Sequence, residues 1–120
     1  MNIGNNKFNR SLYRGQGYAP QIDSEGNLHL HTNYDQLSNL RTLSFDSTRS
    51  GAEHYGKRAA IHPYIIEIDE EFLDTILPKK EYDRERINKG ESFRYDEEFN
   101  EVRLSFKGEI IVPKGKFNVS

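Results

Sequence analysis

The sequence contains no cysteine, no long apolar run and no large excess of one charge. The lack of cysteine excludes a disulfide scaffold, a Cys-ligated zinc site and a Cys nucleophile, and it suits a reducing compartment. No stretch approaches the roughly 18 apolar residues of a membrane span, and the Asn-rich start lacks the apolar core of a signal peptide. With 17 basic and 19 acidic residues, and a pI near 6.1, the chain is not expected to wrap nucleic acid through bulk positive charge.

The apolar content is low but sufficient for a small core. Hydrophobic residues make up 34% of the chain and charged residues 30%. Leu, Ile, Val and Phe together account for about a quarter of the sequence, above the level of roughly 20% below which chains usually stay unfolded. A length of 120 residues suits one domain. We predict a flexible leader over residues 1–10 and a single domain over residues 11–120.

The residue pattern predicts short strands separated by short helices. Strict alternation over residues 28–31 indicates a strand, and the apolar run over residues 64–69 indicates a buried one. Other strands are expected over residues 11–14, 42–45, 102–106 and 109–112, the last two joined by a turn at Lys107-Gly108. Helices are expected over residues 34–40, with Leu37 and Leu40 on one face, over residues 70–77, and from a capping box of Ser50 and Glu53 through Ala59. Strands outnumber helices without a βαβ rhythm, so the fold class is α+β with a mainly antiparallel sheet.

One charged stretch, residues 79–98, departs from this pattern. Thirteen of its twenty residues are charged, and Tyr82, Phe93 and Tyr95 are interleaved among them. Two interpretations stay open. The stretch is either a solvated loop or a surface that contacts a target, in which case Lys79, Lys80, Arg84 and Arg86 could touch phosphates.

Three polar segments follow one another in a distinctive order. They are Leu12-Tyr13-Arg14-Gly15, then Leu43-Ser44-Phe45-Asp46 with Ala52-Glu53-His54-Tyr55-Gly56, and finally Asn100-Glu101-Val102-Arg103-Leu104. In this order and spacing the chain resembles the mono-ADP-ribosyltransferase family. More narrowly, it is similar to the branch with an Arg, a Ser strand and a late Glu, which is found in many bacterial toxin domains. The resemblance runs from about residue 11 to residue 112, and Ser44, Ala52 and Tyr55 fall at the family's spacing.

The resemblance implies an ADP-ribosyltransferase-like fold, with two small, roughly perpendicular, mainly antiparallel sheets and flanking short helices around an NAD cleft. It implies that NAD is a substrate whose nicotinamide–ribose bond is cleaved, with transfer of ADP-ribose to a macromolecule. A protein acceptor is favoured, and nucleic acid is the alternative. The resemblance further implies a toxin or effector that a bacterium secretes or injects, acting in the cytoplasm of a rival or host cell, with a cognate immunity protein. We expect a monomer.

The resemblance assigns a role to each matching residue. Glu101 would stabilise the oxocarbenium-like charge that develops on the ribose, and Ser44 would orient its carboxylate. Arg14 would bind the diphosphate or a ribose through its forked donors, a geometry that Lys cannot copy. Tyr55 would form a wall of the nicotinamide pocket. Gly15 would let the backbone approach the dinucleotide.

Two positions depart from the family pattern. Asp46 replaces the usual Ser or Thr at the end of the Ser strand, and Ser47 could serve instead. Phe99 stands two residues before Glu101, where transferases acting on Arg have Glu. We predict that Phe99, Glu98 and Tyr95 contact the target. NAD hydrolysis with water as acceptor, and a non-catalytic binding module, remain the alternatives.

His29 and His31 share one face of a predicted strand and raise the question of a metal pair. Two ligands without a third nearby do not make a site, because zinc needs three or four protein ligands. The sequence therefore predicts no metal site.

Overall fold

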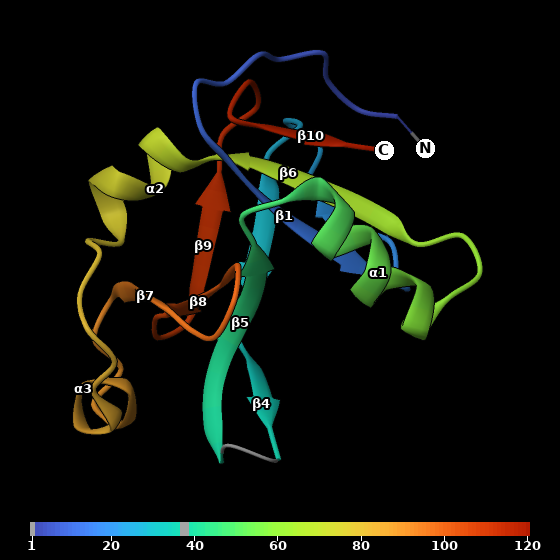
Figure 1. Ribbon diagram of the computed structural model, residues 1–120. Coiled ribbons are helices and arrows are strands. Elements are labelled where there is room, and N and C mark those ends of the chain that lie inside the picture. Colours follow the sequence, from blue (N-terminus) through green and yellow to red (C-terminus); the bar gives the residue numbers. More distant parts are fainter. Residues whose placement is uncertain (1, 37–38) are drawn as a thin grey trace.

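The computed structural model describes residues 2–36 and 39–120. In these residues the chain forms two antiparallel sheets and three short helices (Figure 1). The strands are β1 Ser11–Gln16, β2 Gln21–Ile22, β3 Leu28–His31, β4 Asn33–Asp35, β5 Leu40–Asp46, β6 Tyr64–Asp69, β7 Phe93–Asp96, β8 Glu101–Ser105, β9 Glu109–Val112 and β10 Phe117–Val119. The helices are α1 Arg49–Ala59, α2 Glu70–Ile76 and α3 Arg84–Asn88. The predicted α+β class is confirmed. Within the described ranges, no helix is long and apolar enough to cross a membrane.

The strand order explains how the two sheets are joined. The larger sheet has the order β10-β6-β1-β5-β8-β7, with β4 paired to β5, and the smaller sheet has the order β2-β3-β9. After β8 the chain leaves the larger sheet, and β9 pairs with β3, where Leu28 faces Val112. The turn at Lys107-Gly108 is therefore a crossing between sheets and not a hairpin.

The main core contains side chains from both sheets and from α2. Its fully buried members include Leu12, Leu28, Ile66, Ile68, Leu73, Leu77, Leu104 and Val112. Each such side chain stabilises the fold by about 1.5–3 kcal/mol relative to exposure. Leu28 and Leu30 point into this core, so the alternation of β3 places His29 and His31 on its other face.

The helix predicted over residues 34–40 is wrong. In the described residues this region is a β-hairpin, in which Tyr34 of β4 faces Arg41 of β5 and Asp35 faces Leu40. Asn39 enters β5 with a left-handed φ of 57°, a conformation that Asn tolerates better than most residues. The apolar spacing that suggested a helix involved Leu37, which lies outside the described residues, and Leu40, which is buried in a strand.

Helix α1 begins two residues earlier than its predicted capping box. Thr48 is the N-cap, and its hydroxyl accepts a hydrogen bond of 3.1 Å from the Gly51 amide. The backbone amide and the hydroxyl of Thr48 donate to Asp46 Oδ1 at 2.7 and 2.6 Å. Asp46 therefore fixes the chain before Ser50 is reached, and the Ser50–Glu53 capping box is wrong.

Residues 79–98 are more ordered than a solvated loop. They contain α3 and β7, and Phe93 and Tyr95 form a second core with Leu40 and Ile87. The ring of Tyr95 meets that of Tyr82 edge-on at 5.3 Å between centroids. Burial raises the pKa of Tyr95 to about 12. Because Tyr95 is 0% exposed, its predicted contact with a target is wrong.

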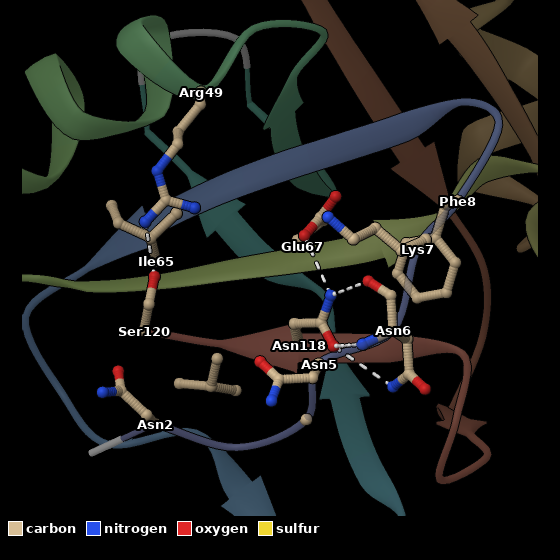
Figure 2. A pocket seen from close by; sticks show the side chains of 12 residues that line it. Asn2, Asn5, Asn6, Lys7, Phe8, Arg49, Ile65, Glu67, Asn118 and Ser120 are labelled. Carbon is tan, nitrogen blue, oxygen red and sulfur yellow. Dashed lines mark hydrogen bonds between the residues drawn. The ribbon is translucent and has the colours of Figure 1, made fainter.

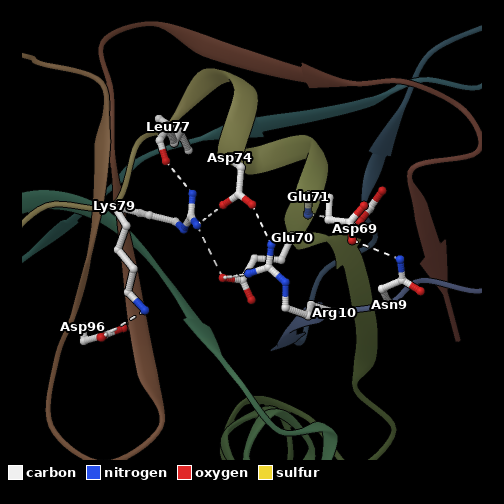
Figure 3. Close-up of polar contacts among 10 residues, drawn as sticks. Asn9, Arg10, Asp69, Glu70, Glu71, Asp74, Leu77, Lys79 and Asp96 are labelled. Atoms are coloured by element: carbon white, nitrogen blue, oxygen red, sulfur yellow. Dashed lines mark hydrogen bonds and ion pairs between the residues drawn. The ribbon is translucent and has the colours of Figure 1, made fainter.

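Between the aromatic residues of β7, Arg94 points to the opposite face and is only 3% exposed. Its guanidinium donates to the Leu77 carbonyl at 2.5 Å, lies 3.4 Å from Glu70 and pairs with Asp74. The carboxylates of Glu70 and Asp74 also bind Arg10, and Figure 3 shows these groups gathered along α2. One buried cation thus ties β7 to the end of α2.

Replacing Arg94 with Ala is expected to lower the free energy of unfolding by about 2–3 kcal/mol, because a buried carbonyl and two carboxylates lose their partner. Arg10 and the partial exposure of Asp74, at 40%, keep the loss below that of a fully buried pair. Arg86→Ala is the control: its ion pairs with Asp83 and Glu91 are exposed and contribute less than about 1 kcal/mol. Urea denaturation measures both, and equal losses would contradict the assignment.

Residues 2–10, predicted to be a flexible leader, contact β10 through Ile3 and Asn6 and α2 through Asn9 and Arg10. The backbones of Ile3 and Val119 exchange two hydrogen bonds of 2.8 Å. The Asn118 side chain binds Asn6 and Glu67 around a cavity of about 430 Å³ (Figure 2). This segment covers the edge of β10, which would otherwise expose unpaired backbone groups.

Candidate functional site

A cavity of about 320 Å³ opens where β1, β5 and β8 lie next to one another and α1 packs against β1 and β5. It is lined by Tyr13, Arg14, Gly15, Ser44, Phe45, Asp46, Ala52, Tyr55, Glu101 and Arg103. Every residue predicted to act in catalysis or to bind NAD is in this lining. Segments from three separate parts of the sequence thus meet at one place.

The register between β5 and β8 brings the Ser and the Glu together. Asp46 faces Glu101, and Ser44 faces Arg103. Directly paired residues share a face of the sheet, so these four side chains point to the same side. The Ser44 hydroxyl donates a short hydrogen bond to Glu101 Oε2. Glu101 Oε1 makes no hydrogen bond to any described residue, which leaves one carboxylate oxygen for a ligand.

Arg14 approaches this pair from β1. Its Nη1 donates to the Ser44 carbonyl at 3.0 Å, and its Nε donates to Gln16 Oε1 at 3.1 Å. Arg14 also lines a smaller hollow of about 80 Å³, which includes Leu28 and His29 of the second sheet. Arg14 therefore borders both the cavity and this hollow beside the smaller sheet.

Arg103 is a site residue that the sequence reasoning missed. Its Nε lies 3.3 Å from Glu101 Oε2, and its Nη1 donates to Asp35 at 3.0 Å. Burial opposes its charge, but the hydrogen bond that it donates to Asp35 and the charge of Glu101 together raise the pKa of Arg103 above its ordinary value. Strand alternation could have identified it, because residues two apart on a strand share a face.

Gly15 is required by the packing of α1 against β1. A Cβ on Gly15 would lie 2.0 Å from the Ala52 carbonyl oxygen and 2.9 Å from the Gly56 amide nitrogen. The helix thus rests directly on the strand. One turn further along the helix, the half-exposed Tyr55 reaches the cavity, and the Arg58 guanidinium lies 5.5 Å from the centre of its ring.

Asp46, which stands where the resemblance has Ser or Thr, has a structural role at the start of α1. It is 9% exposed, and its carboxylate holds Thr48 at the start of α1. A Cβ on Gly51 would lie 2.1 Å from Asp46 Oδ2, so the helix turn closes tightly over the carboxylate. Ser47 is exposed and is not part of the cavity lining, although its amide donates to the Asn100 carbonyl at 2.8 Å.

Glu98 and Phe99 lie on the turn that connects β7 to β8 and ends at Glu101. The amide of Glu97 donates to the Glu101 carbonyl at 2.8 Å. Phe99 is 98% exposed and has a left-handed φ of 60°, which is uncommon for a bulky residue. Glu98 is also exposed. Neither residue is part of the cavity lining, and their contact with a target stays a prediction.

The two histidines of β3 bind carboxylates. His29 Nε2 lies 2.8 Å from Asp23, and its Nδ1 lies 3.1 Å from Glu109, which is also 3.4 Å from His31. In residues 2–36 and 39–120, no group of three or more His, Asp or Glu side chains has the geometry to hold a metal. These imidazoles are explained by their carboxylate partners.

Hydrogen bonds to Asp23 and then Glu109 raise the pKa of His29 above its ordinary value of 6.5. A raised pKa means that the charged imidazole stabilises the fold below pH 6.5, and that this contribution is lost as the pH rises through the folded-state pKa. His29→Gln is therefore expected to lower the Tm more at about pH 5.5 than at about pH 9. The exposed His62 provides the control, and an equal loss at both pH values would contradict the prediction.

Comparisons with family models, with curated proteins and with solved structures find no significant match to this chain.

Proposed function

We propose that this chain is an ADP-ribosyltransferase that cleaves the nicotinamide–ribose bond of NAD. One observation carries the proposal: Arg14, Ser44 and Glu101 line one cavity, and the Ser44 hydroxyl binds Glu101. These are the three residues that define the resemblance, and they come from β1, β5 and β8. Two antiparallel sheets with short flanking helices agree with the fold that the resemblance implies.

In the proposed reaction, the bond between ribose C1′ and the nicotinamide nitrogen breaks. The electron pair leaves with nicotinamide, and positive charge develops on the ribose. Glu101 stabilises this charge, which exists mainly in the transition state, where stabilisation accelerates the reaction. Ser44 holds Oε2 of the carboxylate, so Oε1 is directed at the ribose 2′-hydroxyl. The acceptor then forms a bond to C1′ with its lone pair, and its proton passes to solvent water.

Arg14 and Tyr55 bind the rest of NAD in this proposal. The guanidinium of Arg14 reaches toward the smaller sheet and can bind the diphosphate through two parallel hydrogen bonds. Tyr55 is 52% exposed at the cavity wall, so its ring face is available to the nicotinamide. Gly15 lines the cavity without a side chain that would obstruct the dinucleotide.

The residue at the position expected to contact the acceptor of ADP-ribose also suits a second candidate function, that of an NAD glycohydrolase. Phe99 occupies the position where a transferase acting on Arg has Glu, and it is 98% exposed. A phenyl ring cannot take a proton from an attacking Arg side chain. Water can therefore serve as the acceptor of ADP-ribose instead. In the transferase, Phe99 would instead contact an apolar patch on a protein target. Toxin or effector action in the cytoplasm of a target cell, and a cognate immunity protein that covers the cavity, belong to the same proposal.

Incubation of the chain with NAD and a bacterial lysate tests the proposal. Free nicotinamide together with a macromolecule that gains the mass of one ADP-ribose supports transfer, and free ADP-ribose without a labelled macromolecule supports hydrolysis. If the incubation releases no nicotinamide, the chain is a non-catalytic binding module and the proposal is wrong.

A further inference from the structure

A second polar cavity, of about 420 Å³, lies between the β4–β5 hairpin, the end of α3 and the segment that crosses between the sheets. Its lining includes Arg41, Lys89 and Lys107, together with Tyr34, Asn39 and the buried Phe106. It shares no lining residue with the cavity that contains Glu101. The proposed NAD chemistry therefore does not account for it.

The three cations of this cavity are uncompensated. Its lining contains no Asp or Glu, and none of Arg41, Lys89 and Lys107 forms an ion pair with a described residue. Among the other arginines, Arg10, Arg49, Arg86, Arg94 and Arg103 pair with carboxylates. What distinguishes this cavity is that three cations without an ion-pair partner among the described residues line one hollow. Positive charges gathered around a hollow repel one another, and a bound anion relieves the repulsion.

The cavity also offers groups that suit a nucleobase. Tyr34 is 52% exposed, and its hydroxyl donates to Asn39 Oδ1, which fixes the ring at the cavity. An exposed, fixed aromatic ring is a stacking platform for a base. Phe106 and Ile87 are buried and supply apolar surface beside it. Three cations that could bind a phosphate and the ring of Tyr34 that could stack on a base thus line one hollow of about 420 Å³.

We propose that this cavity binds a nucleotide phosphate, either as a free mononucleotide or as part of a single-stranded nucleic acid. Arg41, Lys89 and Lys107 contact the phosphate, and Tyr34 stacks on the base. Phosphate contacts provide affinity without reading sequence, so the site binds strands of different sequence. The proposal does not depend on NAD cleavage and stands or fails separately from it.

The test uses the full chain without NAD and a labelled single-stranded oligonucleotide of about 8 nucleotides, a typical site size for such proteins. Fluorescence anisotropy at low salt compares the wild type with a triple variant, Arg41→Ala, Lys89→Ala and Lys107→Ala. A matched triple variant removes the same charge from exposed positions that line no described cavity: Lys57→Ala, Lys80→Ala and Arg84→Ala. Thermal unfolding verifies that both variants fold.

We expect the cavity variant to bind the oligonucleotide roughly 30- to 100-fold more weakly than the wild type. The slope of log affinity against log salt concentration should also become shallower by about 2, because three phosphate contacts are lost. The matched variant should lose less than about 3-fold. Tyr34→Leu should weaken binding by about 10-fold. Similar losses in both triple variants, or a wild type that binds neither the oligonucleotide nor thymidine monophosphate, would overturn the proposal.

Amide chemical shifts identify the source of the phosphate. Gly90 and Gly108 line the cavity, and their signals should move on addition of the oligonucleotide. If thymidine monophosphate moves the same signals, the site takes free nucleotides. If only the oligonucleotide does so, the site takes a strand. If neither moves them, no nucleotide binds there and the proposal is wrong.

Discussion

Replacing Glu101 with Gln is expected to lower the rate of nicotinamide release from NAD by about 10²- to 10³-fold while the domain stays folded. Gln keeps the shape of the side chain and can still accept the hydrogen bond from Ser44, so only the charge is removed. Arg103 loses one partner but keeps its hydrogen bond to Asp35, so no cation is left unpaired. Chromatographic detection of nicotinamide measures the rate.

The matched control for this experiment is Glu98→Gln. Glu98 is a carboxylate three residues away, exposed and outside the cavity lining, so its loss should change the rate of NAD cleavage by less than about 3-fold. Equal rates in wild type and Glu101→Gln would mean that the carboxylate does not act in the reaction. A large loss in Glu98→Gln would place the reacting group on the turn before β8.

Substitution of Gly15 by Ala should lower the free energy of unfolding by about 3 kcal/mol, which corresponds to a fall in Tm of roughly 10 °C for a domain of this size. The added methyl group would lie 2.0 Å from the Ala52 carbonyl oxygen. That oxygen belongs to the backbone of α1, so a rotamer change cannot relieve the clash and the helix must move. Thermal unfolding followed by circular dichroism measures the effect.

Gly17→Ala is the control for Gly15→Ala, because it makes the same chemical change two residues away. A Cβ on Gly17 would lie 3.3 Å from Ala59, a contact that a shift of a few tenths of an ångström relieves. We expect a change of less than about 1 kcal/mol. If both variants are equally stable, α1 does not rest on β1 through Gly15.

The strands were predictable where alternation or an apolar run dominates. The alternation of Leu28 with His29 and the run over β6 gave the correct elements, because a half-buried or fully buried strand leaves that pattern directly. The two helices flanking β6 were also predicted, although the N-cap of α1 is Thr48 rather than Ser50. The cap depends on the carboxylate of Asp46, which a capping-box pattern does not include.

The failures share a physical cause, which is that long-range contacts decided the local structure. Residues 33–35 became a strand because β5 offered a partner edge. Tyr95 became buried because Leu40, distant in sequence, and Ile87 of α3 enclose it. High local charge in residues 79–98 concealed both the strand β7 and the buried Arg94, since its carboxylate partners lie on α2.

At the candidate site, the sequence indicated which residues meet but not how they are held. Arg14, Gly15, Ser44, Tyr55 and Glu101 line one cavity, and an ordered set of motifs was enough to predict that. The ion pair from Arg103 was missed, because it depends on the register in which Ser44 faces Arg103. The need for Gly15 was assigned to a dinucleotide, whereas the packing of α1 alone already requires it.

The contact between α1 and β1 also fixes the position of one wall of the cavity. Gly15 lies against the backbone of Ala52 and Gly56, and the helix start is closed over Asp46. A wall attached at two points cannot swing outward to admit a larger molecule. The width of the cavity is thus set when the chain folds. In the proposed NAD reaction, this wall would therefore limit the size of the ligand, and the exposed ring of Tyr55 would be its adjustable part.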